Sequence, residues 1–196
     1  MGKKGSNKRK KIIKFSAKLM REKGYKGASL QQVADHVGIH KSTLFHYFKN
    51  KEELLLAVLR VPIEDLIEEL KMIANNKDLP PEEKLKKAIS THVVLLTSNI
   101  DSANVYHSAM MHLTSKNKKE YLKTRKYYGK CFQQIIDEVK IADEATFKDL
   151  DSKLVSSAIL GMINWMAKWY NKNGKLDIDT ISDQFYRLIT QKNLGA

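Results

Sequence analysis

Apolar residues recur at steps of three and four along most of the chain, a spacing that puts them on one face of a helix. Only three prolines and nine glycines interrupt this pattern, and alternating apolar and polar runs are few. The pattern therefore predicts an all-α fold. It indicates a first helix that ends at Gly24, a second that starts near Leu30 and a third that starts near His40. Further helices are predicted at 51–75, with a bend at Pro62, and at 81–98, 102–114, 117–140, 151–171 and 178–192.

The second and third predicted helices have the residues of a helix-turn-helix. Ser29 followed by Gln32 is a capping-box pattern, which starts the second helix. Ala34 is small enough for two helices to approach closely, and Gly38 suits a tight turn between them. Leu44 is the core aliphatic residue that fixes the next helix across the first. We therefore predict a DNA-binding motif here.

The predicted outer face of the third helix has the chemistry of a DNA-reading surface. It consists of His40, Lys41, Ser42, Thr43, His46 and Tyr47. No carboxylate occurs among them, whereas hydroxyls and positive or aromatic donors suit base edges and phosphates. We expect three residues to position the DNA backbone: Ser29, Tyr47 and Lys51. The candidates for reading bases are Lys41, Ser42, Thr43 and His46.

Charge is distributed unevenly along the chain. Residues 1–60 contain 15 Lys and Arg against 4 Asp and Glu, while the rest contains 20 against 18. This concentration indicates a polyanionic partner for the first third alone. Lys8 to Lys11 are candidates for added contacts to phosphates, although a solvated tail is the simpler interpretation of the run itself. The start of the chain, MGKKGS, also fits a myristoylation pattern. We prefer to interpret this segment as a disordered arm.

The segment from Ile12 to Leu59, and above all TLFHYFKNKEEL, resembles the DNA-binding domain of the TetR family of one-component regulators. The resemblance implies that Thr43, His46 and Tyr47 contact DNA and that Lys51 binds a phosphate. Phe45 departs from the family, which usually has tyrosine there. We expect its phenyl ring to contribute shape, by packing on a thymine methyl, or to face inward.

The helix predicted at 151–171 is apolar on two faces. One stripe consists of Leu154, Ala158, Gly161, Trp165 and Trp169, and the other of Val155, Ile159, Met162, Met166 and Tyr170. A helix that is apolar all round must be covered on both sides. We therefore expect one face to cover the subunit's own core and the other, with the helix at 178–192, to form a homodimer. The dimer would supply the two-fold symmetry that a palindromic DNA site requires.

Candidate ligand-binding residues lie in the helices between these two regions. Arg125 falls in the middle of an apolar stripe, where an unpaired guanidinium is costly to bury, and Asn164 lies among apolar residues. Each is either paired within the core or available to a ligand. Tyr106, Met110 and Met111 add adaptable apolar surface.

The run from TSKNKKEYLKTRKYYGKCFQQIIDE to the last helix resembles the effector domain of TetR-type regulators of fatty-acid and sterol breakdown, which sense acyl-coenzyme A thioesters. The resemblance implies an apolar cavity for the acyl chain and polar groups for the coenzyme. The matching candidates are Arg125, Tyr128, Asn164, Trp165 and Trp169, and Tyr121 lies on the same stripe as Arg125.

These observations predict three segments: a basic arm at 1–10, a three-helix helix-turn-helix DNA-binding domain at 11–59, and a helical ligand-binding and dimerisation domain at 60–196. The expected function is that of a cytoplasmic homodimeric repressor, released from its double-stranded DNA operator by a hydrophobic effector, with acyl-coenzyme A as the preferred class. We expect no cofactor, metal or membrane span.

Three alternatives remain at this stage. A regulator that senses cationic drugs would need acids near its ligand, for which Glu68, Glu120 and Asp137 are candidates. A non-specific basic nucleic-acid-binding protein would leave the neutral two-thirds of the chain unexplained. An enzyme is disfavoured because no nucleophile–base arrangement is recognisable: Cys131 has no histidine near it in sequence.

Overall fold

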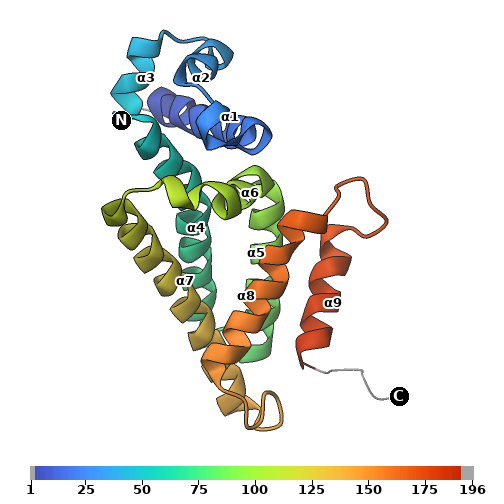
Figure 1. Cartoon of the computed structure of the whole chain (residues 1–196). Coiled ribbons are helices and arrows are strands. Elements are labelled where there is room, and N and C mark those ends of the chain that lie inside the picture. Colours follow the sequence, from blue (N-terminus) through green and yellow to red (C-terminus); the bar gives the residue numbers. More distant parts are fainter. Residues whose placement is uncertain (1–2, 191–196) are drawn as a thin grey trace. The chain divides into compact units, whose positions relative to one another are not determined.

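The computed structural model describes residues 3–190, with their side chains from Ser6 onward, and this part of the chain is entirely helical apart from its connections. The predicted all-α fold is confirmed. The helices, labelled in Figure 1, are α1 (Lys3–Gly27), α2 (Leu30–Val37), α3 (Lys41–Tyr47), α4 (Lys51–Asn75), α5 (Pro81–Ser98), α6 (Ile100–Ala109), the 3-10 turn η1 (Met110–His112), α7 (Ser115–Ala142), α8 (Ser152–Trp169) and α9 (Ile178–Thr190).

The chain forms two compact units. The first unit consists of the chain up to Pro62 together with Asn99–Lys123, and the second of Ile63–Ser98 together with the chain from Thr124 onward. The helices α4 and α7 each contribute residues to both units.

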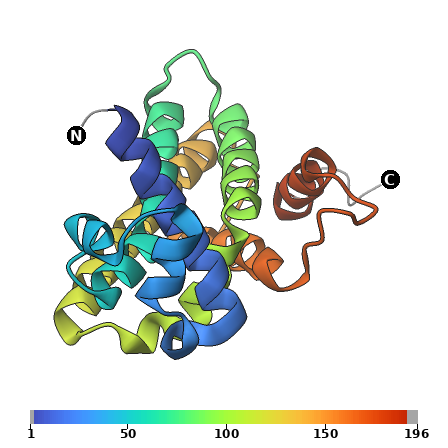
Figure 2. The ribbon, with the colours of Figure 1, turned by 90° about the horizontal axis from the view of Figure 1, so that it is seen from above.

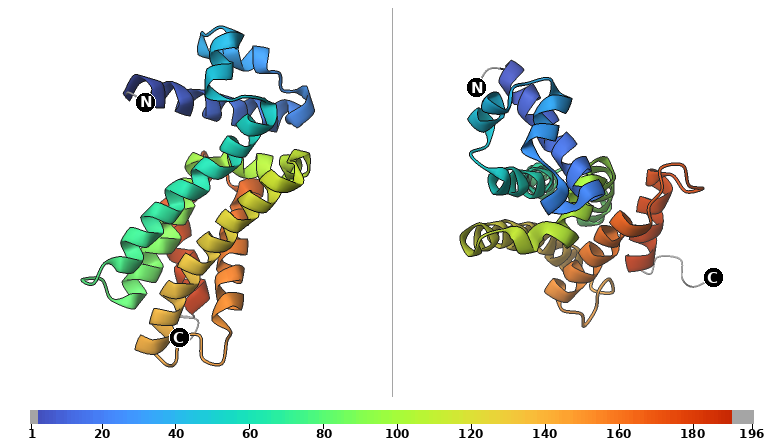
Figure 3. Two further views of the ribbon diagram at one scale, coloured as in Figure 1. Left: turned by 90° about the vertical axis from the view of Figure 1, so that its left-hand side faces the viewer. Right: turned by 45° about the horizontal axis from the view of Figure 1, so that its top comes forward.

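In the first unit, α1 packs against both α2 and α6. Figure 2 shows α1 beside α2, and Figure 3 (left) shows the pair α2 and α3 lying across α1. Apolar side chains of α1, including Ile12 and Met20, are buried in this contact. An ion pair between Arg21 Nε and Asp101 Oδ1, at 3.0 Å, joins α1 to α6.

In the second unit, α5 packs against both α8 and α9 (Figure 1). The α5 residues on its inner face are buried: Lys84, Leu85, Ala88, Ile89, His92, Val93 and Leu96. Lys84 is accommodated because its ammonium donates to Glu138 Oε2 at 2.7 Å and to the Ala74 carbonyl at 2.9 Å. A buried charge paired in this way avoids most of its desolvation penalty.

Several predicted boundaries differ from the structure. The run at 1–10 is helical from Lys3, so it extends α1 and is not a disordered arm. The first residues of the MGKKGS pattern, 1–2, lie outside the described part, as do the last two of the helix predicted at 178–192. Gly24 has a positive φ of 70°, as expected of a helix stop, but helical residues resume after it and continue to Gly27.

The predicted helix at 102–114 starts at Ile100 and ends at Ala109, and the one predicted at 117–140 starts two residues early, at Ser115. The side chain of Thr114 accepts a hydrogen bond from the Asn117 N–H at 3.4 Å. This local bond caps the next helix, and Leu113 turns its side chain into the core. The spacing of apolar residues does not predict the break between α6 and α7.

Candidate functional site

Local hydrogen bonds fix the position of α3. The Ser29 hydroxyl accepts from the Gln32 N–H at 3.1 Å and Gln32 Oε1 accepts from the Ser29 N–H at 3.0 Å, which confirms the predicted capping box. Gly38 then adopts a left-handed conformation, with φ 69° and ψ 47°, and Ile39 N–H donates to the Ala34 carbonyl at 3.0 Å. A glycine adopts this conformation without the steric cost that a side chain imposes.

The inner face of α3 is packed tightly. Leu44 and Phe48 are buried, and Ala34 of α2 is completely covered beneath them. The opposite face must therefore point away from the core. No acidic residue occurs between Asp35 and Glu52, so this outer face carries no negative side chain.

The residues expected to contact DNA lie on α3, at its N-cap, or at the starts of the neighbouring helices α2 and α4. Those that are exposed are Ser29, His40, Lys41, Ser42, Phe45 and His46, and those that are half-buried are Thr43, Tyr47 and Lys51. Phe45 is 43% exposed, so of its two expected placements the inward-facing one is wrong. Its ring is available for an apolar contact on the surface of α3.

Lys51 is held by α1 at the start of α4. Its ammonium donates to the Lys26 carbonyl at 3.1 Å and lies 4.7 Å from the centre of the Tyr25 ring. Desolvation by burial lowers the pKa of Lys51. The ammonium has three N–H donors, and the bond to Lys26 uses one of them. Its position thus depends on α1 as well as on α4.

The N-terminus of α4 is also bonded to the connection between α6 and α7. The Glu52 carboxylate accepts from the Thr114 N–H and from the Asn117 side-chain amide, both at 2.7 Å. These bonds, that of the Thr114 N–H first, lower the pKa of Glu52. About two turns further along α4, Arg60 donates to Glu120 Oε1 at 2.6 Å. The residues 99–123 are therefore joined to the DNA-binding helices by polar contacts.

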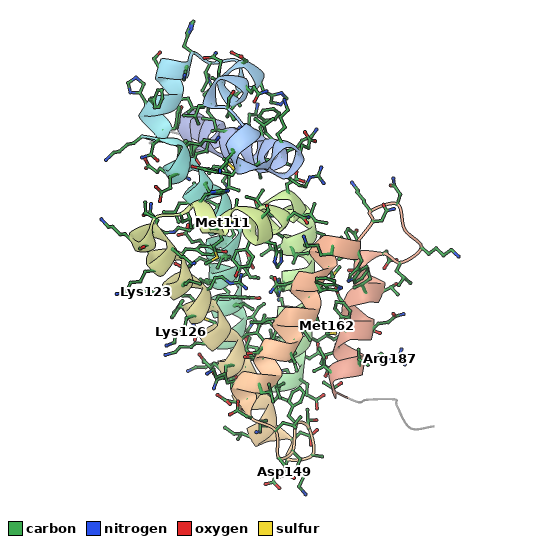
Figure 4. All side chains as sticks on the ribbon, in the orientation of Figure 1. Met111, Lys123, Lys126, Asp149, Met162 and Arg187 are labelled. Carbon is green, nitrogen blue, oxygen red and sulfur yellow. The ribbon has the colours of Figure 1, made fainter. Side chains whose placement is uncertain are left out.

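The ligand-binding candidates fall into three separate places. Tyr106, Met110 and Tyr121 belong to the first unit, where the rings of Tyr106 and Tyr121 lie 5.8 Å apart. Tyr121 is buried, and Met110 is half-buried, whereas the neighbouring Met111 is 78% exposed (Figure 4).

A second group lies inside the second unit. The Tyr128 hydroxyl of α7 is 2.7 Å from Nδ1 of His92 on α5, and both side chains are buried. Burial lowers the pKa of His92 to about 3, opposed by a hydrogen bond with the Asn164 side chain and assisted by the positive charge of Arg125. Burial also raises the pKa of Tyr128. The result is a neutral polar cluster, which we call the His92 cluster: His92, Tyr128 and Asn164, with Arg125 nearby.

Sequence reasoning missed His92 as a member of this site. In the sequence, His92 is a lone histidine on an apolar helix. The available signal was its position on the same face of α5 as Leu85, Ile89 and Leu96, since a buried imidazole requires a hydrogen-bond partner. Only the packing of α5 against its neighbours shows which partner that is.

The third place is the outer face of α8. Trp165 is 61% exposed and Trp169 is 46% exposed, as is Leu154 at 65%. Val155, Ile159 and Met166 face the other way and are buried. The two tryptophans are therefore not brought together with the His92 cluster, although Asn164 is. Of the two predicted apolar stripes of α8, the one with the tryptophans lies outside the subunit's core.

Two of the three acids suggested for a cationic ligand are engaged elsewhere. Glu68 pairs with Lys71 at 2.9 Å and Glu120 with Arg60 at 2.6 Å. Within residues 3–190, no cluster of three or more His, Cys, Asp or Glu side chains is suited to a metal ion. None of the helices described is long and apolar enough to cross a membrane.

Both parts of the chain match known families. Residues 12–58 match the family described as bacterial regulatory proteins, tetR family. Residues 78–192 match the tetracyclin repressor-like C-terminal domain, which is more than half of the chain. The fold and the exposed α3 face are thus those of a helix-turn-helix regulator, and the chain belongs to the TetR family. It is a DNA-binding transcription regulator and not an enzyme.

Individual relatives agree with this assignment. The chain is 23% identical over 185 residues to the HTH-type transcriptional repressor KstR2 of Rhodococcus jostii, which covers 94% of this chain and 90% of the relative. It is 25% identical over 179 residues to the fatty acid metabolism regulator protein of Bacillus subtilis, 91% of each chain. The predicted resemblance to the TetR family and to its fatty-acid regulators is confirmed.

A solved structure shares the fold. AibR in complex with isovaleryl coenzyme A and operator DNA has a TM-score of 0.78 to this chain at 22% identity, and the match covers 93% of this chain and 98% of AibR.

Proposed function

We propose that the protein is a homodimeric transcriptional repressor that binds a palindromic operator and leaves it when a hydrophobic effector, an acyl-coenzyme A thioester, binds the second unit. The observation that carries the effector half of the proposal is the His92 cluster. A neutral imidazole, a phenol and an amide lie together among buried apolar side chains, and a few polar groups in an apolar surrounding are typical of small-molecule sites.

The chemistry of the cluster suits a thioester. Its hydroxyl, amide and imidazole are uncharged groups that can donate hydrogen bonds to a carbonyl oxygen. Buried apolar residues of the same helices, such as Ile89 of α5 and Ile163 of α8, suit an acyl chain. The charge of Arg125, which lowers the pKa of both His92 and Tyr128, favours an anionic ligand over a cationic drug. AibR, a fold relative, binds isovaleryl coenzyme A, which supports the same class.

The exposed stripe of α8 supports the dimer. Leu154, Trp165 and Trp169 form an apolar strip on the outer surface, and large exposed apolar side chains of this kind mark interaction sites. Leu188 of α9, 56% exposed, is a further candidate. A second copy of the chain is the partner we propose, because two-fold symmetry matches the two half-sites of a palindrome.

Release requires only that the effector bind one conformation better than the other. The operator-binding conformation presents both α3 faces at the spacing of the half-sites. An effector that binds more tightly to a conformation with a different spacing lowers the affinity for DNA. The size of the effect is set by the difference between its affinities for the two conformations. The site of action we propose is the cytoplasm, where the DNA is.

The test is fluorescence anisotropy on a labelled duplex from upstream of the protein's own gene, with acyl-coenzyme A thioesters of several chain lengths added. Free coenzyme A and free fatty acids are the controls. We expect an acyl-coenzyme A to release the protein at fixed salt. Release by none of the thioesters would refute the effector class while leaving the regulator in place.

A pair of variants tests the His92 cluster itself. Tyr128→Phe removes the hydroxyl bonded to His92, and Tyr127→Phe removes an exposed hydroxyl from the neighbouring position of α7. We expect Tyr128→Phe to bind DNA normally but to need about tenfold more effector for release, the equivalent of about 1.4 kcal/mol. Equal effector response in the two variants would show that the cluster is structural.

A further inference from the structure

The first turns of α1 form a basic surface. The first 21 residues contain nine Lys and Arg and no Asp or Glu. Within them, Lys10 and Lys11 are exposed and Lys8 and Arg9 are half-buried. Figure 3 (left) shows that these turns extend α1 beyond the pair α2 and α3. We call Lys8, Arg9, Lys10 and Lys11 the basic turn.

A direct contact joins the basic turn to α3. The guanidinium carbon of Arg9 lies 5.2 Å from the centre of the Phe48 ring, and Phe48 is the C-terminal cap of α3. Phe48 is itself buried, so its position is fixed by the core. The cation–π contact therefore holds the basic turn next to the C-terminal end of the helix that reads DNA. The exposed Lys49 follows Phe48 directly and adds positive charge there.

We propose that the basic turn is a second DNA-contacting element, in which Lys8, Lys10 and Lys11 bind phosphates that flank the groove entered by α3. This inference rests on operator binding by α3. Duplex DNA carries one negative charge per about 1.7 Å of its axis, so several phosphates lie within reach of the lysines on a basic turn about 6 Å long. Because the turn is already helical, little conformational entropy is lost when it binds.

DNA is the polyanion that fits best because the basic turn continues the acid-free surface of α3. The carboxylates nearest to α3 in sequence are Glu52 of α4 and Asp35 of α2, and the one nearest to the basic turn is Glu22 of α1. None of the three lies in the basic turn or in α3. Lysines contact phosphates as point charges without reading sequence, so the element adds affinity and not specificity.

The experiment compares two triple variants of equal charge. Lys8→Gln/Lys10→Gln/Lys11→Gln neutralises the basic turn and keeps Arg9 on Phe48. Lys77→Gln/Lys172→Gln/Lys175→Gln neutralises three exposed lysines elsewhere and serves as the control. Glutamine keeps the helix propensity of lysine, and far-ultraviolet circular dichroism verifies folding. The probe is a labelled mixed-sequence duplex of about 40 base pairs, since phosphate contacts contribute to binding of any sequence.

Binding is measured by anisotropy between about 50 and 200 mM salt. Three lost phosphate contacts lower the slope of log affinity against log salt by about 2.7, so the wild type should lose about 40-fold more affinity than the variant over this range. The control should lower the slope by less than one contact, about 0.9.

Two outcomes overturn the inference while DNA binding stands. One is an unchanged slope in the basic-turn variant, and the other is an equal fall in both variants, which would reflect net charge alone. Failure of the wild type to bind any duplex, including the upstream fragment, would refute operator binding itself and the inference with it.

Discussion

The buried imidazole of His92 makes the stability of the protein depend on pH. Its pKa is lowered to about 3 in the folded chain, mainly by burial, and unfolding restores the ordinary value of about 6.5. Between these values the unfolded chain binds one proton more than the folded chain does at this position. The free energy of unfolding therefore falls as the pH falls, by about 1.4 kcal/mol per pH unit once the pH is below about 6.

From about pH 7.5 to about pH 5 the contribution of His92 amounts to a loss of about 2 kcal/mol. Urea unfolding, followed by far-ultraviolet circular dichroism at both pH values, measures it. Other groups also titrate in this range, so His92→Gln is the reference: it removes the imidazole and retains a hydrogen-bonding side chain beside Tyr128. We expect the wild type to lose about 2 kcal/mol more than the variant between the two pH values.

The comparison uses the change with pH, so a uniform destabilisation of His92→Gln does not affect it. Parallel pH dependences in the wild type and the variant would refute the reasoning, because they would mean that His92 titrates equally in the folded and unfolded chains. A larger loss in the variant would reverse the sign and refute it as well.

Three further predictions concern other elements. Gly38→Ala should lower the free energy of unfolding by about 1 kcal/mol, because Gly38 has a positive φ. Gly129→Ala, inside α7 with open space where a Cβ would lie, should raise it by about 0.5–1 kcal/mol. Urea midpoints that move in the same direction would contradict this. Thr43→Ala should alter preference at individual base pairs by about 1–3 kcal/mol, and Lys51→Ala should weaken binding to all sequences alike. Both are measured by anisotropy on single-base-pair variants of the operator. A changed sequence preference in Lys51→Ala would show that Lys51 does not act by binding phosphate. Trp165→Asp should convert the proposed homodimer to a monomer, as measured by light scattering after size-exclusion chromatography. An unchanged mass would place the interface elsewhere.

The DNA-binding half of the protein was largely predictable because its signals are local. The bond between Ser29 and Gln32 and the turn at Gly38 involve residues a few positions apart, and both are as expected. The exposed face of α3 was predicted from the position of Leu44, which is buried as expected.

The ligand-binding half was less predictable because it depends on which helices meet. Two apolar stripes of α8 were evident, but their periodicity is the same, and only the packing of α5 against α8 shows which one the core covers. For the same reason Trp165 could not be separated from Asn164 as a ligand candidate. The partnership of His92 with Tyr128 spans 36 positions and has no local signature.

The polar contacts of residues 99–123 set a limit on how this protein can be recombined. Family matches at 12–58 and 78–192 suggest a modular chain whose DNA-binding part could be exchanged between relatives. Yet Glu52 bonds to Thr114 and Asn117, and Arg21 pairs with Asp101. A chimera joined near residue 59 would take Glu52 and Arg21 from one relative and the positions of their partners from the other. The exchangeable module is discontinuous, and a working hybrid carries the α6 segment along with the helix-turn-helix.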